Sequence, residues 1–384
     1  MGKVTVVLDS QAGSCGKGKF VGYLSQSDHM DIAIDNFMSN AGHTYVDDKY
    51  GRVMTQHLPT SIVQKDCALC IGPGAAITPS ILFNEIIHYN DIIGDRQIYV
   101  HPRAMVILQR HAEKEKELIR SGSTFKGCGV AQAEKIMRVP GTMLFGEWYS
   151  TVDWSNTPIE YGDCVVDHTM STKQIQSILY HIVVTDTMPM LNEYIDSGYN
   201  VMVEGSQGCD LDINYGLNYP YTTSRQCHAG QLLADCGISP KLVTDIVMIM
   251  RPYPIRISNT TNIGLNISSG DYDGASEITW DEVKRRCGAP QDVQLGEQTT
   301  VTKKTRRVFE MNWERFQYVC KLNRPTCIAL NFAQYLDYKA IGCKRYSDLP
   351  KNVREFIDNV ENIAGVKVGL IGTGAMNDEI IDVR

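Results

Sequence analysis

Short runs of consecutive apolar residues recur along the chain, separated by stretches long enough to hold a helix. The first run, Val4–Leu8, is rich in β-branched side chains and leads into a turn with several glycines. A run of this kind is typical of a strand buried on both faces, as in a parallel sheet. Similar runs occur at Cys67–Ile71, Val201–Val203, Val243–Met250 and Val366–Ile371.

Other stretches have the spacing of helices. The first follows the glycine-rich turn and contains Phe20, Val21, Tyr23 and Leu24. Near the end of the chain, Val353, Phe356, Ile357 and Val360 recur at i, i+3, i+4 and i+7. That spacing predicts one buried face of an amphipathic helix, which Gly365 is placed to cap. The almost wholly charged stretch Glu113–Glu117 predicts a solvated helix face.

The alternation of strands and helices predicts an α/β fold with a large, mostly parallel central sheet flanked by helices. The sequence shows no repeat, no low-complexity segment and no Pro/Ser-rich linker. We therefore expect residues 1–384 to form a single domain that carries smaller inserted subdomains.

The composition excludes several classes of partner. Of the 384 residues, 43% are hydrophobic and 21% charged, as in an ordinary globular protein, and the net charge of −7 provides no broad basic surface for nucleic acid. The N-terminus lacks the apolar stretch and cleavage site of a signal peptide, and no apolar run reaches the length of a membrane span. We expect a cytoplasmic protein that binds neither nucleic acid nor a membrane.

The twelve cysteines show no disulfide-framework spacing. Cys67 and Cys70 form one CxxC, but a zinc site would need two further ligands at suitable spacing, and there is no second CxxC. These two thiols are expected to be buried in or beside a strand.

The strongest local signal is Gly13-Ser14-Cys15-Gly16-Lys17-Gly18-Lys19. Three glycines let backbone N–H groups approach phosphate oxygens, the following helix adds its positive end, and two lysines add charge. The spacing is not that of a Walker A loop, which has four residues between its glycines. The motif predicts phosphate binding, with an ordinary tight turn as the alternative.

Three further stretches carry candidate chemistry. Asn40–Thr44 contains His43, which is either catalytic or structural, and Glu204–Gly208 follows a predicted strand, where α/β sheets bind ligands. Thr299–Arg307 holds four cations among hydroxyl residues. It suits either an anionic ligand or a solvated basic loop.

Taken together, these motifs resemble adenylosuccinate synthetase over nearly the whole chain. The family's GDEGKGK loop stands here as GSCGKGK, its NAGHT is intact at Asn40–Thr44, and its EGAQG is Glu204–Gly208. Its LPSGIL, TxRGIGP, YPFVTSSN and STGPDRDE segments match Leu58–Val63, Thr124–Gly129, Tyr219–Gln226 and Gly372–Glu379.

The resemblance implies that a nucleoside triphosphate phosphorylates the purine O6 and that the amine of L-aspartate then displaces phosphate, with Mg²⁺ at the phosphates. Catalysis is assigned to Ser14, His43 and Gln207, with His43 as general acid, and Ser14 and the Gly42 carbonyl are the expected Mg²⁺ contacts. Triphosphate binding is assigned to Ser14, Gly16, Lys17, Gly18, Lys19, Gly42, His43, Thr44, Asn331, Gln334, Gly372 and Gly374.

The same resemblance assigns two further ligands. The purine monophosphate is expected at Ser14, Asn40, Ser123, Thr124, Arg138, Gln207, Thr222 and Thr223, with Arg138 supplied across a homodimer. Aspartate is expected at Val301, Thr302, Lys303, Lys304 and Arg306.

Three departures from the family pattern change the expected substrates. Ser14 replaces an aspartate, and the smaller, uncharged side chain makes room for the 2-amino group of guanine. Gln334 replaces the aspartate that reads guanine in GTP, and an amide pairs with adenine, which indicates ATP or dATP. Lys304 replaces an arginine that reaches the ribose, which fits a 2′-deoxy sugar.

These departures, with the stretches from Thr299 to Phe309 and from Leu330 to Leu336, resemble the phage 2-aminoadenylosuccinate synthetases, which use dGMP to make the precursor of 2-aminoadenine. The sequence leaves two alternatives open: a divergent adenylosuccinate synthetase acting on IMP with GTP, and a non-catalytic nucleotide-binding regulator.

Overall fold

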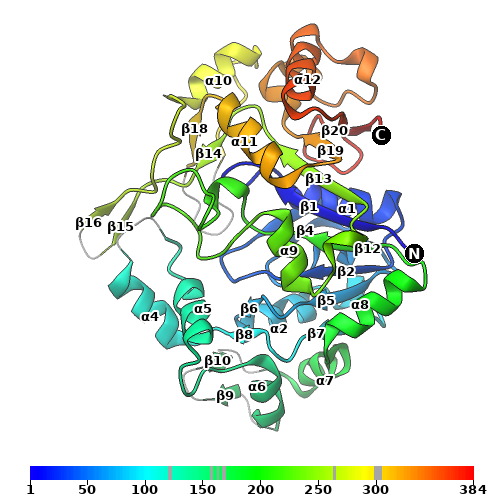
Figure 1. Cartoon of the computed structure of the whole chain (residues 1–384), viewed down its shortest axis with the longest axis vertical. Coiled ribbons are helices and arrows are strands. Elements are labelled where there is room, and N and C mark those ends of the chain that lie inside the picture. Colours follow the sequence, from blue (N-terminus) through cyan, green and yellow to red (C-terminus); the bar gives the residue numbers. More distant parts are fainter. Residues whose placement is uncertain (120–122, 156–158, 162–163, 167–169, 263–264, 298–304) are drawn as a thin grey trace.

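The computed structural model describes residues 1–119, 123–155, 159–161, 164–166, 170–262, 265–297 and 305–384. Its centre is a ten-stranded sheet in which every neighbouring pair is parallel except the last (Figure 1). In sheet order the strands are β11 (Ile182–Val184), β7 (Ile98–Val100), β5 (Ala68–Ile71), β2 (Ile32–Asp35), β12 (Val201–Glu204), β1 (Val4–Asp9), β13 (Asp245–Met250), β19 (Cys327–Leu330), β20 (Val368–Gly372) and the antiparallel β21 (Ile380–Asp382).

Helices and small sheets surround this sheet. The helices are α1 (Lys17–Ser27), α2 (Pro79–His88), α3 (Asn90–Ile93), α4 (Gln109–Leu118), α5 (Cys128–Met137), α6 (Phe145–Thr151), α7 (Thr172–His181), α8 (Thr187–Asp196), α9 (Ala229–Cys236), α10 (Trp280–Cys287), α11 (Trp313–Asn323) and α12 (Lys351–Ala364). The small sheets pair β3 (His43–Asp47) with β4 (Gly51–Thr55), β6 (Ala76–Ile77) with β8 (Met105–Val106), β9 (Ile159–Tyr161) with β10 (Cys164–Val166), and β15 (Thr260–Asn262) with β16 (Leu265–Ile267); β18 (Arg307–Phe309) lies between β14 (Ile255–Arg256) and β17 (Glu277–Ile278).

The predicted α/β class and mostly parallel sheet are confirmed. All five apolar runs contain strands of the central sheet, with ends that differ from the prediction by up to two residues. Val243 and Thr244 precede β13, and β20 begins at Val368 after a turn. Burial on both faces explains why these strands read as continuous apolar runs.

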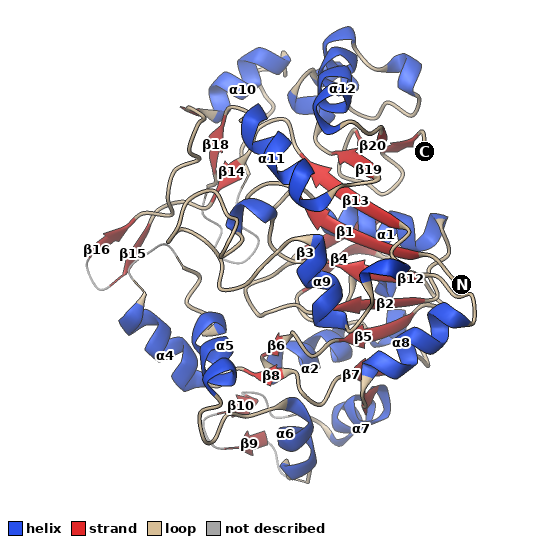
Figure 2. Ribbon diagram, viewed as in Figure 1, coloured by secondary structure: helices blue, strands red, loops and turns tan. Residues whose placement is uncertain are grey.

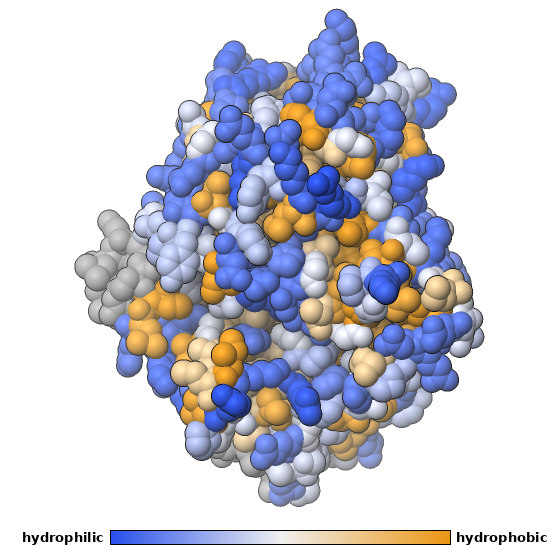
Figure 3. All heavy atoms as spheres, in the orientation of Figure 1, coloured by the Kyte–Doolittle hydropathy of each residue, from blue (hydrophilic) through white to orange (hydrophobic). Residues whose placement is uncertain are grey.

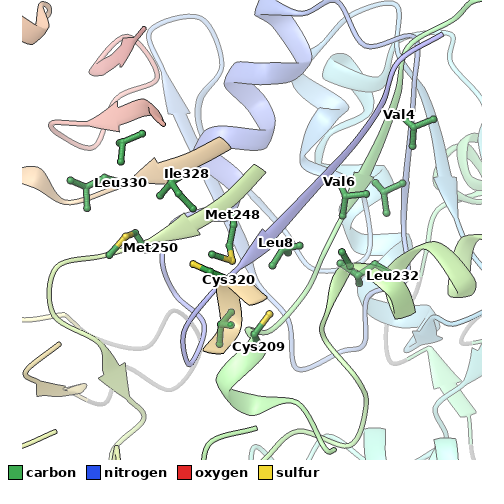
Figure 4. Close-up of a cluster of buried hydrophobic side chains, with 14 of the residues drawn as sticks. Val4, Val6, Leu8, Cys209, Leu232, Met248, Met250, Cys320, Ile328 and Leu330 are labelled. Carbon is green, nitrogen blue, oxygen red and sulfur yellow. The ribbon is translucent and has the colours of Figure 1, made fainter. Parts of the chain in front are cut away.

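Alternate residues of β1 point to opposite faces of the sheet. Val4, Val6 and Leu8 pack in the cluster covered by α8, α9, α11 and α12, and part of this cluster is drawn in Figure 4. Val7 packs on the opposite face against Phe20 of α1. Helices on both faces leave the carboxyl edge of the sheet as the place where loops meet.

Helix α12 has the predicted amphipathic character. Val353, Ile357 and Val360 are buried, and Gly365 ends the helix in the left-handed conformation at φ 70°. Hydrophilic side chains cover the outward side of α12 at the top of Figure 3.

The charged helix α4 differs from prediction at one position. Glu113 and Glu117 are exposed, but Glu115 is only 4% exposed, and its carboxylate accepts hydrogen bonds from the backbone N–H groups of Gly127 and Gly129. A fully solvated helix face was therefore the wrong expectation, because local N–H donors compensate the buried charge.

Cys67 and Cys70 are both fully buried, as predicted, and burial raises the pKa of Cys67 to about 12. In the described part of the chain, no helix is long and apolar enough to cross a membrane.

Candidate active site

The candidate site lies at the carboxyl ends of neighbouring strands of the sheet. The arrows of the central strands point the same way in Figure 2, so the segments that follow β12, β1, β13, β19 and β20 emerge at one edge. Polar residues follow or end these strands, among them Glu204, Arg251 and Asn331. Ligands of open α/β sheets bind at such an edge.

The glycine-rich loop holds three residues with positive φ angles. Gly13, Ser14 and Gly16 have φ values of 84°, 59° and 87°, and Gly16 is the N-cap of α1 without a side-chain cap. The amide of Asn331 donates to the carbonyl of Cys15 at 2.9 Å, and a Cβ on Gly16 would lie 2.2 Å from this amide. Glycine at 16 therefore allows the segment after β19 to pack on the loop.

The two loop lysines are buried and bonded to backbone carbonyls. Lys17 Nζ lies 2.6 Å from the carbonyl of Gln207 and 3.4 Å from Asp9 Oδ2. Lys19 Nζ donates to the carbonyls of Gly374 and Glu379 at 2.7 and 2.9 Å. Burial lowers the pKa of Lys19 from 10.5 to about 7. A bound polyphosphate would favour its charged form.

Asp9 is a site residue that the sequence analysis did not identify. It is 1% exposed, and its carboxylate accepts the backbone N–H groups of Gln11 and Cys15, at 2.9 and 3.0 Å, in addition to pairing with Lys17. Its position at the end of β1, directly before the glycine-rich turn, was the available signal.

His43 is paired with a buried carboxylate. Its Nδ1 lies 2.5 Å from Glu204 Oε1, and Glu204 also accepts from Thr60 through the hydroxyl and the backbone N–H, each at 2.7 Å. The ring of Phe37 packs edge-on against the imidazole, with centroids 4.5 Å apart. This arrangement fixes the orientation of the ring and places Nε2 on the side away from Glu204. The sequence motif contained Glu204 but did not identify it as the partner of His43.

The residues assigned to the purine lie next to this pair. Gln207 has φ 59°, and its side-chain amide donates to Asn40 Oδ1 at 3.2 Å. Its carbonyl is the one that accepts from Lys17. The structure thus joins Asn40, Gln207 and Lys17, which are far apart in sequence, into one hydrogen-bonded group.

Several of the other residues assigned to the triphosphate contact one another. Thr44 packs against the backbone of Gly18, where a Cβ would lie 2.7 Å from the Thr44 carbonyl oxygen. A Cβ on Gly372 would lie 2.2 Å from Asn331 Oδ1, whereas Gly42 is exposed with open space around it.

Two side-chain oxygens after β19 are buried without a hydrogen-bond partner among the described atoms: Asn331 Oδ1 and Gln334 Oε1. Buried polar atoms are normally bonded, so each of these oxygens is an acceptor with unused hydrogen-bonding capacity. An exocyclic amine is one group that would donate to them.

The residues assigned to the monophosphate lie in several loops. Thr223 is buried, and its N–H donates to the Leu211 carbonyl at 2.7 Å, while Thr222 is half-buried. The Ser123 hydroxyl accepts from the N–H of Phe125, and Thr124 is exposed. Arg138 ends α5 in the left-handed conformation with an exposed side chain.

Of the predicted aspartate residues, Val301, Thr302, Lys303 and Lys304 lie outside the described residues. Arg306 is described: its N–H donates to the Glu297 carbonyl at 2.8 Å, and its Nε is buried without a partner among the described atoms. Its neighbour Arg307 instead forms ion pairs with Asp271 and Glu277. Arg306 is thus the described cation of this stretch that has an unmatched donor.

No group of three or more His, Cys, Asp or Glu side chains that could hold a metal ion occurs within the described ranges.

The chain is similar to known proteins over most of its length. Residues 6–340 match the adenylosuccinate synthetase family. The N6-succino-2-amino-2'-deoxyadenylate synthase of Acinetobacter phage SH-Ab 15497 is 34% identical over 346 residues, covering 87% of this chain and 85% of that protein. The adenylosuccinate synthetase of Pyrococcus sp. (strain ST700) is 29% identical over 389 residues, covering 99% and 98%.

A solved structure shares the fold. The succinoaminodeoxyadenylate synthetase of cyanophage S-2L, bound to dGMP and to dATP as an energy donor, matches with a TM-score of 0.78 and 27% identity. The match covers 100% of this chain and 96% of that chain.

Proposed function

The chain belongs to the adenylosuccinate synthetase family, and we propose that it joins L-aspartate to the 6-position of dGMP with ATP or dATP as phosphoryl donor. The product would be 2-amino-2′-deoxy-N6-succinyladenylate, a precursor of 2-aminoadenine for phage DNA. The observation that carries this proposal is Ser14. It is an uncharged residue in a glycine-rich loop that retains both lysines of the family, in a chain that also retains a hydrogen-bonded His43–Glu204 pair.

The reaction has two steps. The γ-phosphoryl group passes to guanine O6 as the N1 proton leaves, which gives a 6-phosphoryl nucleotide and the nucleoside diphosphate. The amine of aspartate then attacks C6 and loses a proton, the C6–O bond breaks, and inorganic phosphate leaves with that oxygen. Both steps depend mainly on positioning and on stabilising charge at the phosphoryl group.

The His43–Glu204 pair would stabilise the transferring phosphoryl group. Glu204 accepts the Nδ1 proton and so orients the ring, and Nε2 on the opposite side of the ring would act on a phosphoryl oxygen. Lys17 and Lys19 would leave their carbonyl partners for the triphosphate, and backbone N–H groups at the start of α1 would bind its oxygens.

Mg²⁺ fits this site as a companion of the triphosphate. The Ser14 hydroxyl and the exposed Gly42 carbonyl are hard oxygen donors, which Mg²⁺ prefers, and they would hold it alongside phosphate oxygens. The ion would neutralise part of the negative charge of the phosphates.

The choice of purine follows from the size of residue 14. Guanine differs from hypoxanthine by the 2-amino group beside N1, and serine makes more room there than aspartate. The acceptor and donor of the Gln207 amide would hold the purine near O6, close to Asn40.

The choice of donor follows from the segment after β19. Gln334 Oε1 and Asn331 Oδ1 are buried acceptors, and adenine presents an N6–H₂ donor where guanine presents a carbonyl. The cyanophage S-2L enzyme, bound to dATP, supports an adenine nucleotide here.

The exposed Arg138 would reach the monophosphate of a second copy in a homodimer, together with Thr223 and Thr124 of that site. Nucleotides and aspartate are cytoplasmic metabolites, so the reaction would take place in the cytoplasm of the host cell.

The test is product analysis by mass spectrometry with IMP, GMP or dGMP, each combined with ATP or GTP and with aspartate. We expect the aspartate adduct of dGMP with ATP. An adduct formed only from IMP and GTP would show an adenylosuccinate synthetase instead, and no adduct from any combination would refute ligase activity.

A further inference from the structure

Arg225 is a cation that bridges two other segments at the carboxyl edge of the sheet, and its side chain is only 9% exposed. Nη1 donates to the backbone carbonyl of Asn36, directly after β2, and Nη2 donates to the carboxylate of Asp235 on α9. The backbone carbonyl of Arg225 accepts the N–H of Ile213 at 3.1 Å. One residue thus joins the segment after β12 to the segment after β2 and to a helix that packs on the sheet.

Asn36 is also held by its own side chain. It is 4% exposed, its Oδ1 accepts the N–H of Gly74 at 2.8 Å, and its Nδ2 donates to Cys236 Sγ at 3.2 Å. A Cβ on Gly72 would lie 2.4 Å from the same Oδ1, so glycine at 72 lets the loop after β5 pack against Asn36. The loop after β5, α9 and Arg225 together fix the position of Asn36.

The segment that Asn36 begins, which we call segment 36–40, carries residues of the candidate site. The ring of Phe37 is 1% exposed and packs on the imidazole of His43, and Asn40 accepts from the side-chain amide of Gln207. Because Phe37 and Asn40 lie in the same short segment as Asn36, a displacement of the Asn36 carbonyl would move both.

Arg225 is close in sequence to residues assigned to the monophosphate. It lies two positions after Thr223, whose N–H donates to the Leu211 carbonyl at 2.7 Å. Ser224 packs on the start of α5, where a Cβ on Gly129 would lie 3.3 Å from the Ser224 Cβ. The stretch from Thr223 to Arg225 therefore contacts α5 on one side and segment 36–40 on the other.

A guanidinium suits this bridge because its N–H groups form a rigid planar fork. The two Nη atoms reach different partners, a carbonyl and a carboxylate, so the contacts fix the plane of the group as well as its position. In the family's YPFVTSSN pattern, the position of Arg225 is a serine, which has one short hydroxyl. The bridge is therefore a feature of this chain and not of the family pattern.

We propose that Arg225 is a positioning residue that sets the spacing between segment 36–40 and Thr223, and so preorganises the site for both ends of dGMP. The proposal rests on the proposed function, which places the purine near Asn40 and Gln207 and the monophosphate at Thr223. Arg225 would stay paired with Asp235 when the nucleotide binds. The phosphoryl donor is assigned to other segments, so the effect should be confined to dGMP.

The test compares two ligands in the same variant. Calorimetry gives the Kd of dGMP and, separately, the Kd of the non-hydrolysable ATP analogue AMP-PNP with Mg²⁺. Arg225→Lys keeps the charge but loses the fork, so the Kd of dGMP should rise roughly 10-fold, as for a lost hydrogen bond between charged groups. The Kd of AMP-PNP should stay within about 2-fold. In steady-state assays the variant should raise the KM for dGMP more than it lowers kcat.

Asp235→Asn distinguishes positioning from direct contact with the phosphate. Asparagine removes the charge that anchors the guanidinium but leaves Arg225 in place. If Arg225 acts through segment 36–40, dGMP should bind about 3-fold or more weakly than to the wild-type protein. If Arg225 instead left Asp235 to bind the monophosphate, the weaker anchor would tighten dGMP. This variant also keeps the test available should Arg225→Lys fail to fold.

Arg384→Lys is the matched control. Arg384 bridges Asp28, after α1, and Asp382 of the antiparallel strand β21, at the amino edge of the sheet. Both changes replace a bridging guanidinium by an ammonium group, but Asp28 and Asp382 are not among the residues assigned to a ligand. The control should keep the Kd of dGMP within about 2-fold, and thermal unfolding checks that each variant is folded.

The outcomes separate the two proposals. If the wild-type protein does not bind dGMP, the proposed function fails. If it does, the positioning role of Arg225 is refuted by a folded Arg225→Lys protein that keeps the wild-type Kd for dGMP or weakens dGMP and AMP-PNP equally. It is also refuted if Asp235→Asn binds dGMP as tightly as the wild-type protein or more tightly, or if Arg384→Lys weakens dGMP as much as Arg225→Lys.

Discussion

Replacing Glu204 by glutamine tests whether the buried carboxylate makes His43 an effective acid. Glu204 is 1% exposed and accepts three hydrogen bonds, one from His43 and two from Thr60. A glutamine has a single acceptor oxygen. The Thr60 N–H can only donate, so that oxygen must face it, and the NH₂ group must then face His43 Nδ1.

The size of the effect follows from this geometry. With an NH₂ group at Nδ1, the imidazole must accept there, and a positively charged ring would place two donors against each other. The variant loses one charge-assisted hydrogen bond, worth about 1.5–3 kcal/mol. At about 1.4 kcal/mol for each factor of ten, kcat should fall roughly 10- to 150-fold. His43→Asn, which removes the ring, should cost about 10²- to 10⁴-fold.

The assay is initial-rate formation of the aspartate adduct, with kcat and KM determined separately and folding checked by thermal unfolding. The KM values for dGMP and ATP should stay within about 3-fold, because a 3-fold change is well under 1 kcal/mol and the dyad acts on the transition state. Thr60→Val is the control, since it removes one hydroxyl but keeps the Thr60 N–H and the His43 contact, and it should lower kcat less than Glu204→Gln. A folded Glu204→Gln protein with wild-type kcat would refute the role of the pair.

Three further predictions concern substrate choice and pH. Gln334→Asp should raise the KM for ATP roughly 10-fold or more and admit GTP, because a second carboxylate oxygen replaces the amide donor; an unchanged preference in competition assays would show that Gln334 does not contact the base. Ser14→Asp should lower the ratio of kcat/KM for dGMP over IMP, since overpacking beside the 2-amino group costs about 1–3 kcal/mol. The left-handed backbone at Ser14 tolerates aspartate, so the variant should fold. An unchanged ratio would show that residue 14 does not select the purine. Lys19 has a pKa of about 7 in the ligand-free protein and should be charged beside a triphosphate. Binding of AMP-PNP at pH 8 should therefore take up protons, and the affinity should weaken as pH rises above 7. Calorimetry in two buffers of different ionisation enthalpy measures the proton uptake, which the Lys19→Gln variant should abolish.

Five of the ten strands of the central sheet could be predicted, because burial on both faces makes them stand out as apolar runs, whereas β2, β7, β11, β19 and β21 were not among the predicted runs. The small sheets could not be predicted. In the pairing of β14 with β18, Ile255 lies opposite Val308, and each strand has only two or three residues. Such short strands show no periodicity in the sequence, and their pairing is determined by the tertiary fold.

The candidate site was predicted as motifs but not as contacts. The sequence pointed to His43 and to the segment that begins at Glu204, but their pairing follows from the placement of β12 beside β2. Asp9 carried no motif at all. Glu115 was expected to be solvated because charge in a sequence does not reveal which N–H groups will face it.

The strand order also sets when the protein becomes able to bind nucleotide during its synthesis. Strand β1, which carries the phosphate loop, is paired with β12 and β13, so it has no partner in the sheet until the ribosome has added residues 201–204. Lys19 obtains its carbonyl partners still later, from Gly374 and Glu379, 355 and 360 positions further along the chain. A nascent chain therefore contains the first motif of the site long before the rest of the site is made. A polypeptide truncated ahead of β20 would lack both carbonyls that accept hydrogen bonds from Lys19 in the ligand-free protein.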